Sequence, residues 1–224
     1  MYKLEDLAPT VRSQIRAANL PMKTVGLEFS DLQPNPSFEK VQSWIKSVKA
    51  GKVVQAAGSP NCGKGLLLLG KPGHGKTTIA SVALQELLRG MSAEAWGSPN
   101  LTLRRPAMFM DYPRLLRVQK AQWSDFDDSI ETMINGIYGD SAKENVVRTF
   151  VLDDLGKEHR TASGWAENTF DELLRARFNS GLPTIVTSNT PLSRWEEQYG
   201  APMASFAYEA FIILEVNSGK DLRR

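Results

Sequence analysis

The stretch Gly70-Lys71-Pro72-Gly73-His74-Gly75-Lys76-Thr77 constrains the fold more than any other part of the chain. It fits the pattern Gly-x-x-x-x-Gly-Lys-[Ser/Thr] and directly follows the apolar run Leu66-Leu67-Leu68-Leu69. This order predicts a buried strand, then a phosphate-binding loop, then a helix. Glycines let such a loop turn tightly and point successive backbone N–H groups at phosphate oxygens. The alternative is a glycine-rich surface turn, which would match the pattern by chance in about one chain in a hundred of this size.

We expect this loop to hold the phosphates of ATP. Lys76 would reach the β- and γ-phosphates, and the Thr77 hydroxyl would bind Mg²⁺. The helix that begins at Lys76 would favour negative charge at its N-terminus. His74 is expected only to shape the loop, with its side chain in solvent. The expected nucleotide-binding residues of the loop and the first helical turn are Gly70, Lys71, Pro72, Gly73, His74, Gly75, Lys76, Thr77 and Thr78.

A second apolar run, Thr149-Phe150-Val151-Leu152, ends in Asp153 and Asp154. Ligands of open α/β sheets bind at the carboxyl ends of the strands, so these two acids are expected to face the bound phosphates. Asp153 would hold the Mg²⁺ shell, and Asp154 would orient or deprotonate the attacking water. The alternative is that both aspartates cap the next turn, since Asp-Asp before Gly156 is also good turn chemistry.

A further strand, Thr184 to Asn189, also ends in polar residues. The amide of Asn189 would reach the γ-phosphate or the attacking water. The alternative for Asn189 is an Asx turn before Pro191.

Strand and helix patterns alternate along the chain, which predicts an α/β protein with a parallel sheet. Residues 91–106 lack an apolar period and are expected to form a loop. The expected strands are 66–69, 107–110, 149–154, 184–189 and 211–216; the expected helices are 4–18, 38–49, 77–89, one opened by Pro113, 129–138, 166–179 and 191–199.

Composition narrows the class of protein. The 224 residues include 27 basic and 25 acidic side chains, so a surface that binds nucleic acid must be local. The single cysteine, Cys62, excludes an internal disulfide framework and suits a reducing cytosol. No apolar run approaches the length of a membrane span, and the N-terminus has no signal-peptide core. We therefore expect a cytoplasmic protein.

Three stretches resemble the AAA+ ATPases of the DnaC/DnaI helicase-loader and IstB transposition-helper group. They are the strand and loop Gly65–Thr77, Val151-Leu152-Asp153-Asp154-Leu155-Gly156-Lys157-Glu158, and Thr184–Asn189. The resemblance covers residues 20–224. It implies a P-loop AAA+ five-stranded parallel sheet flanked by helices, with the helical lid absent or truncated. It also implies a division into an N-terminal helix and extended arm, residues 1–36, and an ATPase domain, residues 37–224.

The same resemblance assigns roles to further residues. Asn189 would be the sensor 1 residue that reads the γ-phosphate, and Arg223 would match a later, sensor 2-like arginine. The position of the trans-acting arginine finger holds Phe206, which cannot replace a guanidinium. Either a nearby residue such as Arg194 or Arg223 supplies the finger, or turnover by self-assembly is weak, or a different protein is the neighbour in the complex.

The resemblance implies an ATP-binding and hydrolysing helicase loader that engages single-stranded DNA and a replicative helicase, expected to be a hexameric ring.

ATP-dependent self-assembly is expected as well. Two alternatives stay open: an IstB-like transposition helper ATPase that coats duplex DNA, and a weakly catalytic, nucleotide-dependent adaptor, for which Phe206 is the support.

A local run of basic residues is the candidate DNA surface. Arginines that follow a phosphate backbone, with an aromatic ring that stacks on a base, suit single-stranded DNA, and Trp123 lies just beyond the run. The alternative is a solvated face with Trp123 in the core. The candidate residues are Arg104, Arg105, Arg114, Arg117 and Lys120.

The amphipathic helix expected at 4–18 has two interpretations. It either folds onto the main domain or serves as a docking arm for a partner, and the residues do not decide between them.

Overall fold

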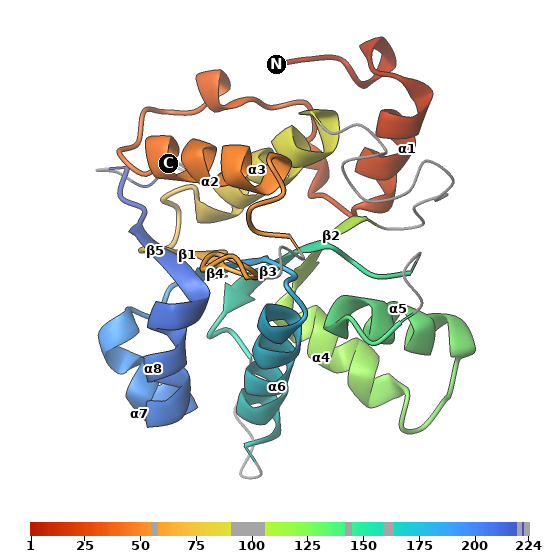
Figure 1. The fold of residues 1–224 in the computed structure, drawn as a ribbon, viewed down its shortest axis with the longest axis vertical. Helices are drawn as coiled ribbons and strands as arrows, with labels where there is room; N and C mark the ends of the chain where they lie inside the picture. Colours follow the sequence, from red (N-terminus) through yellow and green to blue (C-terminus); the bar gives the residue numbers. More distant parts are fainter. Residues whose placement is uncertain (55–57, 91–105, 142–144, 159–163, 219–220, 222–224) are drawn as a thin grey trace.

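A parallel sheet separates two layers of helices in the computed structural model (Figure 1). The structure describes residues 1–54, 58–90, 106–141, 145–158, 164–218 and 221. Within them the sheet has five strands in the order β2-β3-β4-β1-β5, and every neighbouring pair is parallel. The strands are β1 Gly65–Leu69, β2 Ala107–Asp111, β3 Thr149–Leu155, β4 Thr184–Ser188 and β5 Phe211–Glu215.

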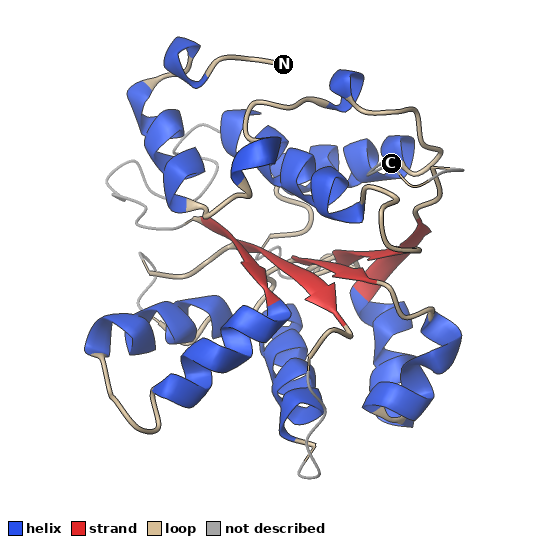
Figure 2. Cartoon of the chain, turned by 180° about the vertical axis from the view of Figure 1, so that it is seen from behind, coloured by secondary structure: helices blue, strands red, loops and turns tan. Residues whose placement is uncertain are grey.

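Helices cover both faces of this sheet. One face carries α1 Pro9–Ala17, α2 Phe38–Lys49 and α3 Lys76–Gly90. The view from behind shows the same two layers (Figure 2). The other face carries α4 Tyr112–Ala121, α5 Asp128–Tyr138, α6 Trp165–Asn179, α7 Trp195–Tyr199 and α8 Ala201–Ala210. Short 3-10 turns are η1 Leu4–Asp6, η2 Met22–Thr24, η3 Phe29–Asp31 and η5 Leu192–Arg194.

The continuous apolar runs of the central strands follow from this layering. Side chains alternate between the two faces of a strand, so a strand covered on both faces needs apolar residues throughout. Leu66 and Leu68 pack with the α1–α3 layer, whereas Leu67 and Leu69 pack with the α4–α8 layer. All four are at most 1% exposed. Each such side chain contributes about 2 kcal/mol of burial free energy, so β1 stabilises both cores.

The predicted α/β class and five-stranded parallel sheet are confirmed. The single helix expected at 4–18 is wrong, because the chain forms η1 and then α1. Pro9 lacks a backbone N–H and cannot continue a helix, but it is well suited to begin one. The sequence analysis assigned no element to the residues of α8. The loop expected at 91–106 lies outside the described residues except for Pro106.

The N-terminal segment packs onto the sheet domain. Ile15, Ala18 and Leu20 are buried in the same apolar cluster as α2 and α3. The amide of Phe109 in β2 donates to the Ala18 carbonyl at 2.7 Å. These contacts favour the first interpretation of the segment, a helix folded onto the main domain, while a partner-docking role stays a prediction. No helix in the described part of the chain is both long and apolar enough to span a bilayer.

Arg177 of α6 is a charged side chain with 0% exposure inside this fold. Its guanidinium donates to the Thr184 hydroxyl at 2.8 Å and to the Val147 carbonyl at 2.9 Å. It also donates to the carbonyls of Ile137, Arg148 and Pro183. Burial lowers the pKa of Arg177 to about 9. One side chain thereby provides hydrogen-bond donors for the backbone carbonyls where α5, β3 and β4 meet.

Replacing this guanidinium tests its role in stability. We expect Arg177→Met to lower the free energy of unfolding by about 3 kcal/mol, because several buried carbonyls lose their donor. Arg175→Met is the matched control, since Arg175 forms a half-exposed pair with Asp171 at 2.9 Å. The control is expected to change stability by about 1 kcal/mol or less. Urea unfolding measures both, and equal effects would contradict the assignment.

Candidate functional site

The loop Gly70–Thr77, hereafter the phosphate loop, connects the end of β1 to the start of α3. Gly73 and Gly75 have φ angles of 82° and 88°, a left-handed conformation that favours glycine. The first N–H groups of a helix have no partner within the helix and carry a partial positive charge. The loop and α3 therefore form a place that suits an anion such as phosphate.

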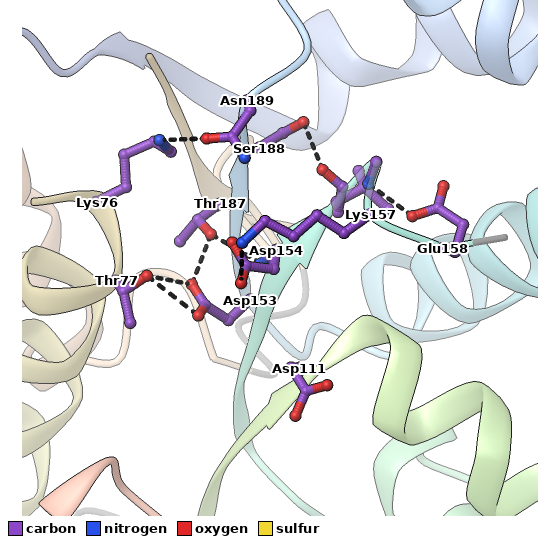
Figure 3. A network of polar contacts seen from close by, with 12 residues as sticks. Lys76, Thr77, Asp111, Asp153, Asp154, Lys157, Glu158, Thr187, Ser188 and Asn189 are labelled. Atoms are coloured by element: carbon purple, nitrogen blue, oxygen red, sulfur yellow. Dashed lines mark hydrogen bonds and ion pairs between the residues drawn. The ribbon is translucent and has the colours of Figure 1, made fainter. Parts of the chain in front are cut away.

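Lys76 links this loop to the end of β4. Its ammonium group donates to the carbonyl oxygens of Gly70 at 2.7 Å and Lys71 at 2.9 Å, and to Asn189 Oδ1 at 2.7 Å. The residue is only 5% exposed. Figure 3 shows the contact between Lys76 and Asn189. The structure thus brings together two residues that the sequence analysis placed at one site, the lysine of the loop and the amide that follows β4.

Asp153 lies at the centre of a hydroxyl network. Its carboxylate accepts from the Thr187 hydroxyl at 2.6 Å and from the Thr77 hydroxyl at 3.0 and 3.1 Å (Figure 3). Burial raises the pKa of Asp153, and the neighbouring Asp154 adds to the rise, while the hydroxyls of Thr187 and Thr77 oppose it. The network joins β3, β4 and the first turn of α3.

Thr187 is a site residue that the sequence analysis missed. The register aligns Leu152 of β3 with Val186 of β4, so the next residues, Asp153 and Thr187, lie side by side. Both follow residues of the α4–α8 core, and alternation turns them to the α3 face. A polar residue one position before the end of a buried strand was the signal that could have identified it.

Asp154 has a backbone conformation unlike that of its neighbours. Its φ angle is 60°, and the β3–β4 register shifts between Leu152 and Leu155. Its amide donates to the Thr187 hydroxyl at 3.0 Å, and its carboxylate accepts from the Lys157 ammonium at 2.6 Å. The irregular strand end aims successive carboxylates differently, so Asp153 is buried whereas Asp154 lines an open cavity.

The donor set suits a small hard cation. Asp153 and Thr77 offer a carboxylate and a hydroxyl side by side, and Mg²⁺ prefers oxygen ligands. Among the described residues there is no group of three or more His, Cys, Asp or Glu side chains that could hold a metal ion alone. This agrees with the usual mode of Mg²⁺, which keeps water and phosphate oxygens as further ligands.

A cavity of about 200 Å³ opens in front of the phosphate loop. Its lining includes Lys23, Leu27, Lys76, Thr77, Asp154, Lys157 and Asn189. A smaller hollow of about 60 Å³ lies beside it and shares Gly75 and Thr78 with it. The smaller hollow is lined in addition by Leu32, Gln33, Asn35, Phe38, His74, Ile79 and Ser218.

His74 differs from the prediction. Its side chain was expected to point to solvent, but it is partly buried, and its Nδ1 accepts a hydrogen bond from the Ser218 amide at 3.1 Å. The segment after β5 packs against the phosphate loop, and the ring fills part of the space between them. The expectation failed because Ser218 is distant in sequence. Arg223, the expected sensor 2-like residue, lies outside the described residues.

Phe206 of α8, at the expected finger position, packs against α6. Its ring meets that of Phe178 edge to face at 5.2 Å, and the Arg175 guanidinium lies 4.4 Å from its centroid. Arg194 is exposed and forms a 3.5 Å ion pair with Glu197. The structure thus adds Arg175, which the sequence analysis did not name, to the arginines near this position.

The candidate DNA residues of α4 are exposed. Arg114, Arg117 and Lys120 lie on the outer face of the helix. Trp123 is 68% exposed and meets Trp165 edge to face at 5.1 Å, so the alternative that places Trp123 in the core is wrong. Acidic residues also follow it, with Asp125, Asp127 and Asp128 exposed nearby. Arg104 and Arg105 lie outside the described residues.

Comparison with solved structures identifies the fold. The DnaC helicase loader superposes with a TM-score of 0.61 and 21% identity, over 88% of this chain and 100% of that chain. DnaI gives a TM-score of 0.61 and 21% identity, over 89% and 95%. The chain therefore shares the fold of these two proteins.

The similarity extends to a replication initiator. DnaA bound to AMPPCP and single-stranded DNA superposes with a TM-score of 0.59 and 12% identity, over 89% of this chain and 51% of that chain. No family model matches the sequence, and no curated protein is significantly similar to it. The predicted resemblance to the DnaC/DnaI group is therefore confirmed at the level of the fold.

The Asp153 network leads to a prediction for Thr187. We expect Thr187→Val to weaken the Mg²⁺-dependent part of ATP affinity about tenfold, as for other groups that orient a metal ligand. Since the hydroxyl opposes the rise in the pKa of Asp153, its loss should also move the fall of Mg²⁺-dependent affinity on acidification to higher pH. Titration of a fluorescent ATP analogue from pH 5 to 8, roughly the range above an ordinary carboxyl pKa, measures both. Thr190→Val is the control, and an unchanged pH profile in Thr187→Val would contradict the role.

Proposed function

We propose that this chain is an ATP-binding and hydrolysing AAA+ protein that acts in DNA replication as a helicase loader. The observation that carries the proposal is the network in which Asp153 joins Thr77 and Thr187, beside the contact between Lys76 and Asn189. A helix N-terminus, a lysine, a threonine hydroxyl that contacts the buried Asp153, and an amide converge on one cavity. These are the parts that phosphoryl transfer requires for positioning and charge stabilisation.

Each residue of the site has a separate role in the proposed reaction. The amides of the phosphate loop hold the α- and β-phosphates, and Lys76 exchanges contacts with backbone carbonyls for contacts with the β- and γ-phosphates. Asp153 and Thr77 hold Mg²⁺, which when bound neutralises charge on the transferred group. Asp154 accepts a proton or a hydrogen bond from the attacking water. Asn189 is released from Lys76 and reads the terminal phosphate.

We place the nucleoside beside the phosphate loop, at the smaller hollow. Phe38, Leu32 and Ile79 supply apolar surface, and Gln33 and Asn35 supply amides. Thr78 lines both hollows, which is the position expected of a residue next to the α-phosphate and ribose. Apolar walls with a few polar groups are typical of small-molecule sites.

The loader assignment comes from the similarity to DnaC and DnaI, and its partners are a hexameric replicative helicase and single-stranded DNA. ATP-dependent self-assembly is part of the proposal, with Arg175, Arg194 or Arg223 of a neighbouring copy as the cation that Phe206 does not provide. A cytoplasmic location is expected for such a protein. A pull-down with the cognate replicative helicase tests the partner, and recruitment of a transposase instead would favour the IstB-like alternative.

A weakly catalytic adaptor is the second candidate, and the packing of Phe206 favours it. The aromatic side chain is held against Phe178 and Arg175 and offers no charge to a neighbour's nucleotide. Steady-state hydrolysis with and without single-stranded DNA separates the two. Turnover that rises with DNA supports the loader, and absence of turnover under both conditions supports the adaptor.

The two aspartates are expected to differ in function. Asp154→Asn should keep Mg²⁺–ATP affinity within about twofold and lower kcat at least about a hundredfold, because only the proton acceptor is lost. Asp153→Asn should instead weaken the Mg²⁺-dependent affinity about tenfold or more. Equilibrium binding and phosphate release measure the two quantities. Equal effects of both variants on binding would show that the roles are misassigned.

The exposed basic residues of α4, Arg114, Arg117 and Lys120, are proposed to contact the DNA backbone. Reversal of charge in Arg114→Glu with Arg117→Glu should weaken single-stranded DNA binding and lower the slope of log K against log salt by about one. Lys3→Glu with Arg16→Glu makes the same change in net charge on the other side of the sheet, where both residues are exposed. Fluorescence anisotropy at several salt concentrations measures the slope. The same slope in both double variants would refute the assignment.

A further inference from the structure

Lys157 is a further cation of the candidate site. It lies beyond the end of β3, yet it lines the same cavity as the phosphate loop. The cavity lining also contains Lys23 and Lys76 but no arginine among the described residues. Any arginine must therefore come from elsewhere, whereas Lys157 belongs to the same chain.

The turn after Asp154 directs Lys157 back toward the cavity. The left-handed conformation of Asp154 starts the turn, and the Lys157 amide donates to the Asp154 carbonyl at 3.2 Å. The Lys157 ammonium then reaches the Asp154 carboxylate at 2.6 Å (Figure 3). The lysine thus contacts the carboxylate proposed to activate water.

The backbone around Lys157 is anchored, although its side chain is not buried. The next residue, Glu158, accepts from the Gly156 amide at 2.6 Å and from the Tyr199 hydroxyl at 3.0 Å. Glu158 is 9% exposed, whereas the Lys157 side chain is 46% exposed. A fixed origin and a flexible, solvated stem allow the ammonium group to change partners within the cavity.

The charges of the site favour such a change. Asp153 and Asp154 place two carboxylates near the phosphate loop, and Lys76 is the cation already bound to that loop. A triphosphate brings further negative charge. An exposed lysine–carboxylate pair is weak, so a phosphate oxygen that carries more charge competes well for the ammonium. The exchange would also free the Asp154 carboxylate to accept a hydrogen bond from water.

We propose that Lys157 is a catalytic residue of the proposed ATPase. When ATP binds, the Lys157 ammonium leaves the Asp154 carboxylate and binds the terminal phosphate within the same chain. The inference rests on the proposed function and extends it. Lys157 would distinguish ATP from ADP, because only ATP carries the γ-phosphate. It would also couple the arrival of that phosphate to the release of Asp154.

The ratio of ATP affinity to ADP affinity tests the proposal. Lys157→Met should weaken ATP binding about tenfold, the typical effect of losing one charged hydrogen bond, and leave ADP affinity within about twofold. It should also lower kcat. Lys157→Arg keeps the charge and should restore most of the ATP preference. Lys52→Met is the control, since Lys52 is an exposed lysine outside the cavity lining.

Competition titrations with a fluorescent nucleotide on the full chain measure these affinities. An unchanged ATP-to-ADP ratio in Lys157→Met would overturn the inference, as would an equal loss of both affinities, which marks a structural role. Neither result would contradict the proposed function, because the wild-type chain would still bind ATP. If the wild-type chain binds neither nucleotide, the proposed function fails, and the inference fails with it.

Discussion

The buried carboxylate of Asp153 is the interaction on which the site depends. A carboxylate this little exposed is stable only with hydrogen-bond donors around it, and the donors come from β4 and α3. Three elements distant in sequence must therefore dock in one register before the charge is satisfied. Since Thr77 also belongs to the phosphate loop, the same docking sets the distance between loop and strand end. The fold is held together on both faces by apolar packing, but the site is held by these few polar contacts.

The fold was largely predictable from the sequence, because β1 is an apolar run and β3 and β4 contain shorter apolar runs, all buried on both faces of the sheet. The convergence of Lys76, Asp153 and Asn189 was predictable as well, since parallel strands share one carboxyl edge. Contacts that depend on register or on distant loops were not. The role of Thr187 could be identified only from the β3–β4 register. The contact of His74 with Ser218 could be identified only from the path of the chain after β5. The break before α1 could have been predicted from Pro9.

The structure contains two contacts that the proposed nucleotide would replace. Lys76 is bound to Asn189, and Lys157 is bound to Asp154, so these two cations have partners within the chain that a phosphate would replace. Glu158 and Tyr199 continue from this region toward α7 and α8, where Phe206 lies. The polar contacts at the strand ends thus extend to α7, which packs against α8.

Calorimetric titration of the full chain with ATP, with and without Mg²⁺, tests the central claim most directly. The account predicts one site per chain, tighter binding with Mg²⁺, and a ligand-dependent rise in Tm, since a ligand that binds only the folded state stabilises it. Lys76→Ala should retain the fold by circular dichroism and lose the binding heat. Absence of binding by the wild-type chain, or unchanged binding in Lys76→Ala, would contradict the account.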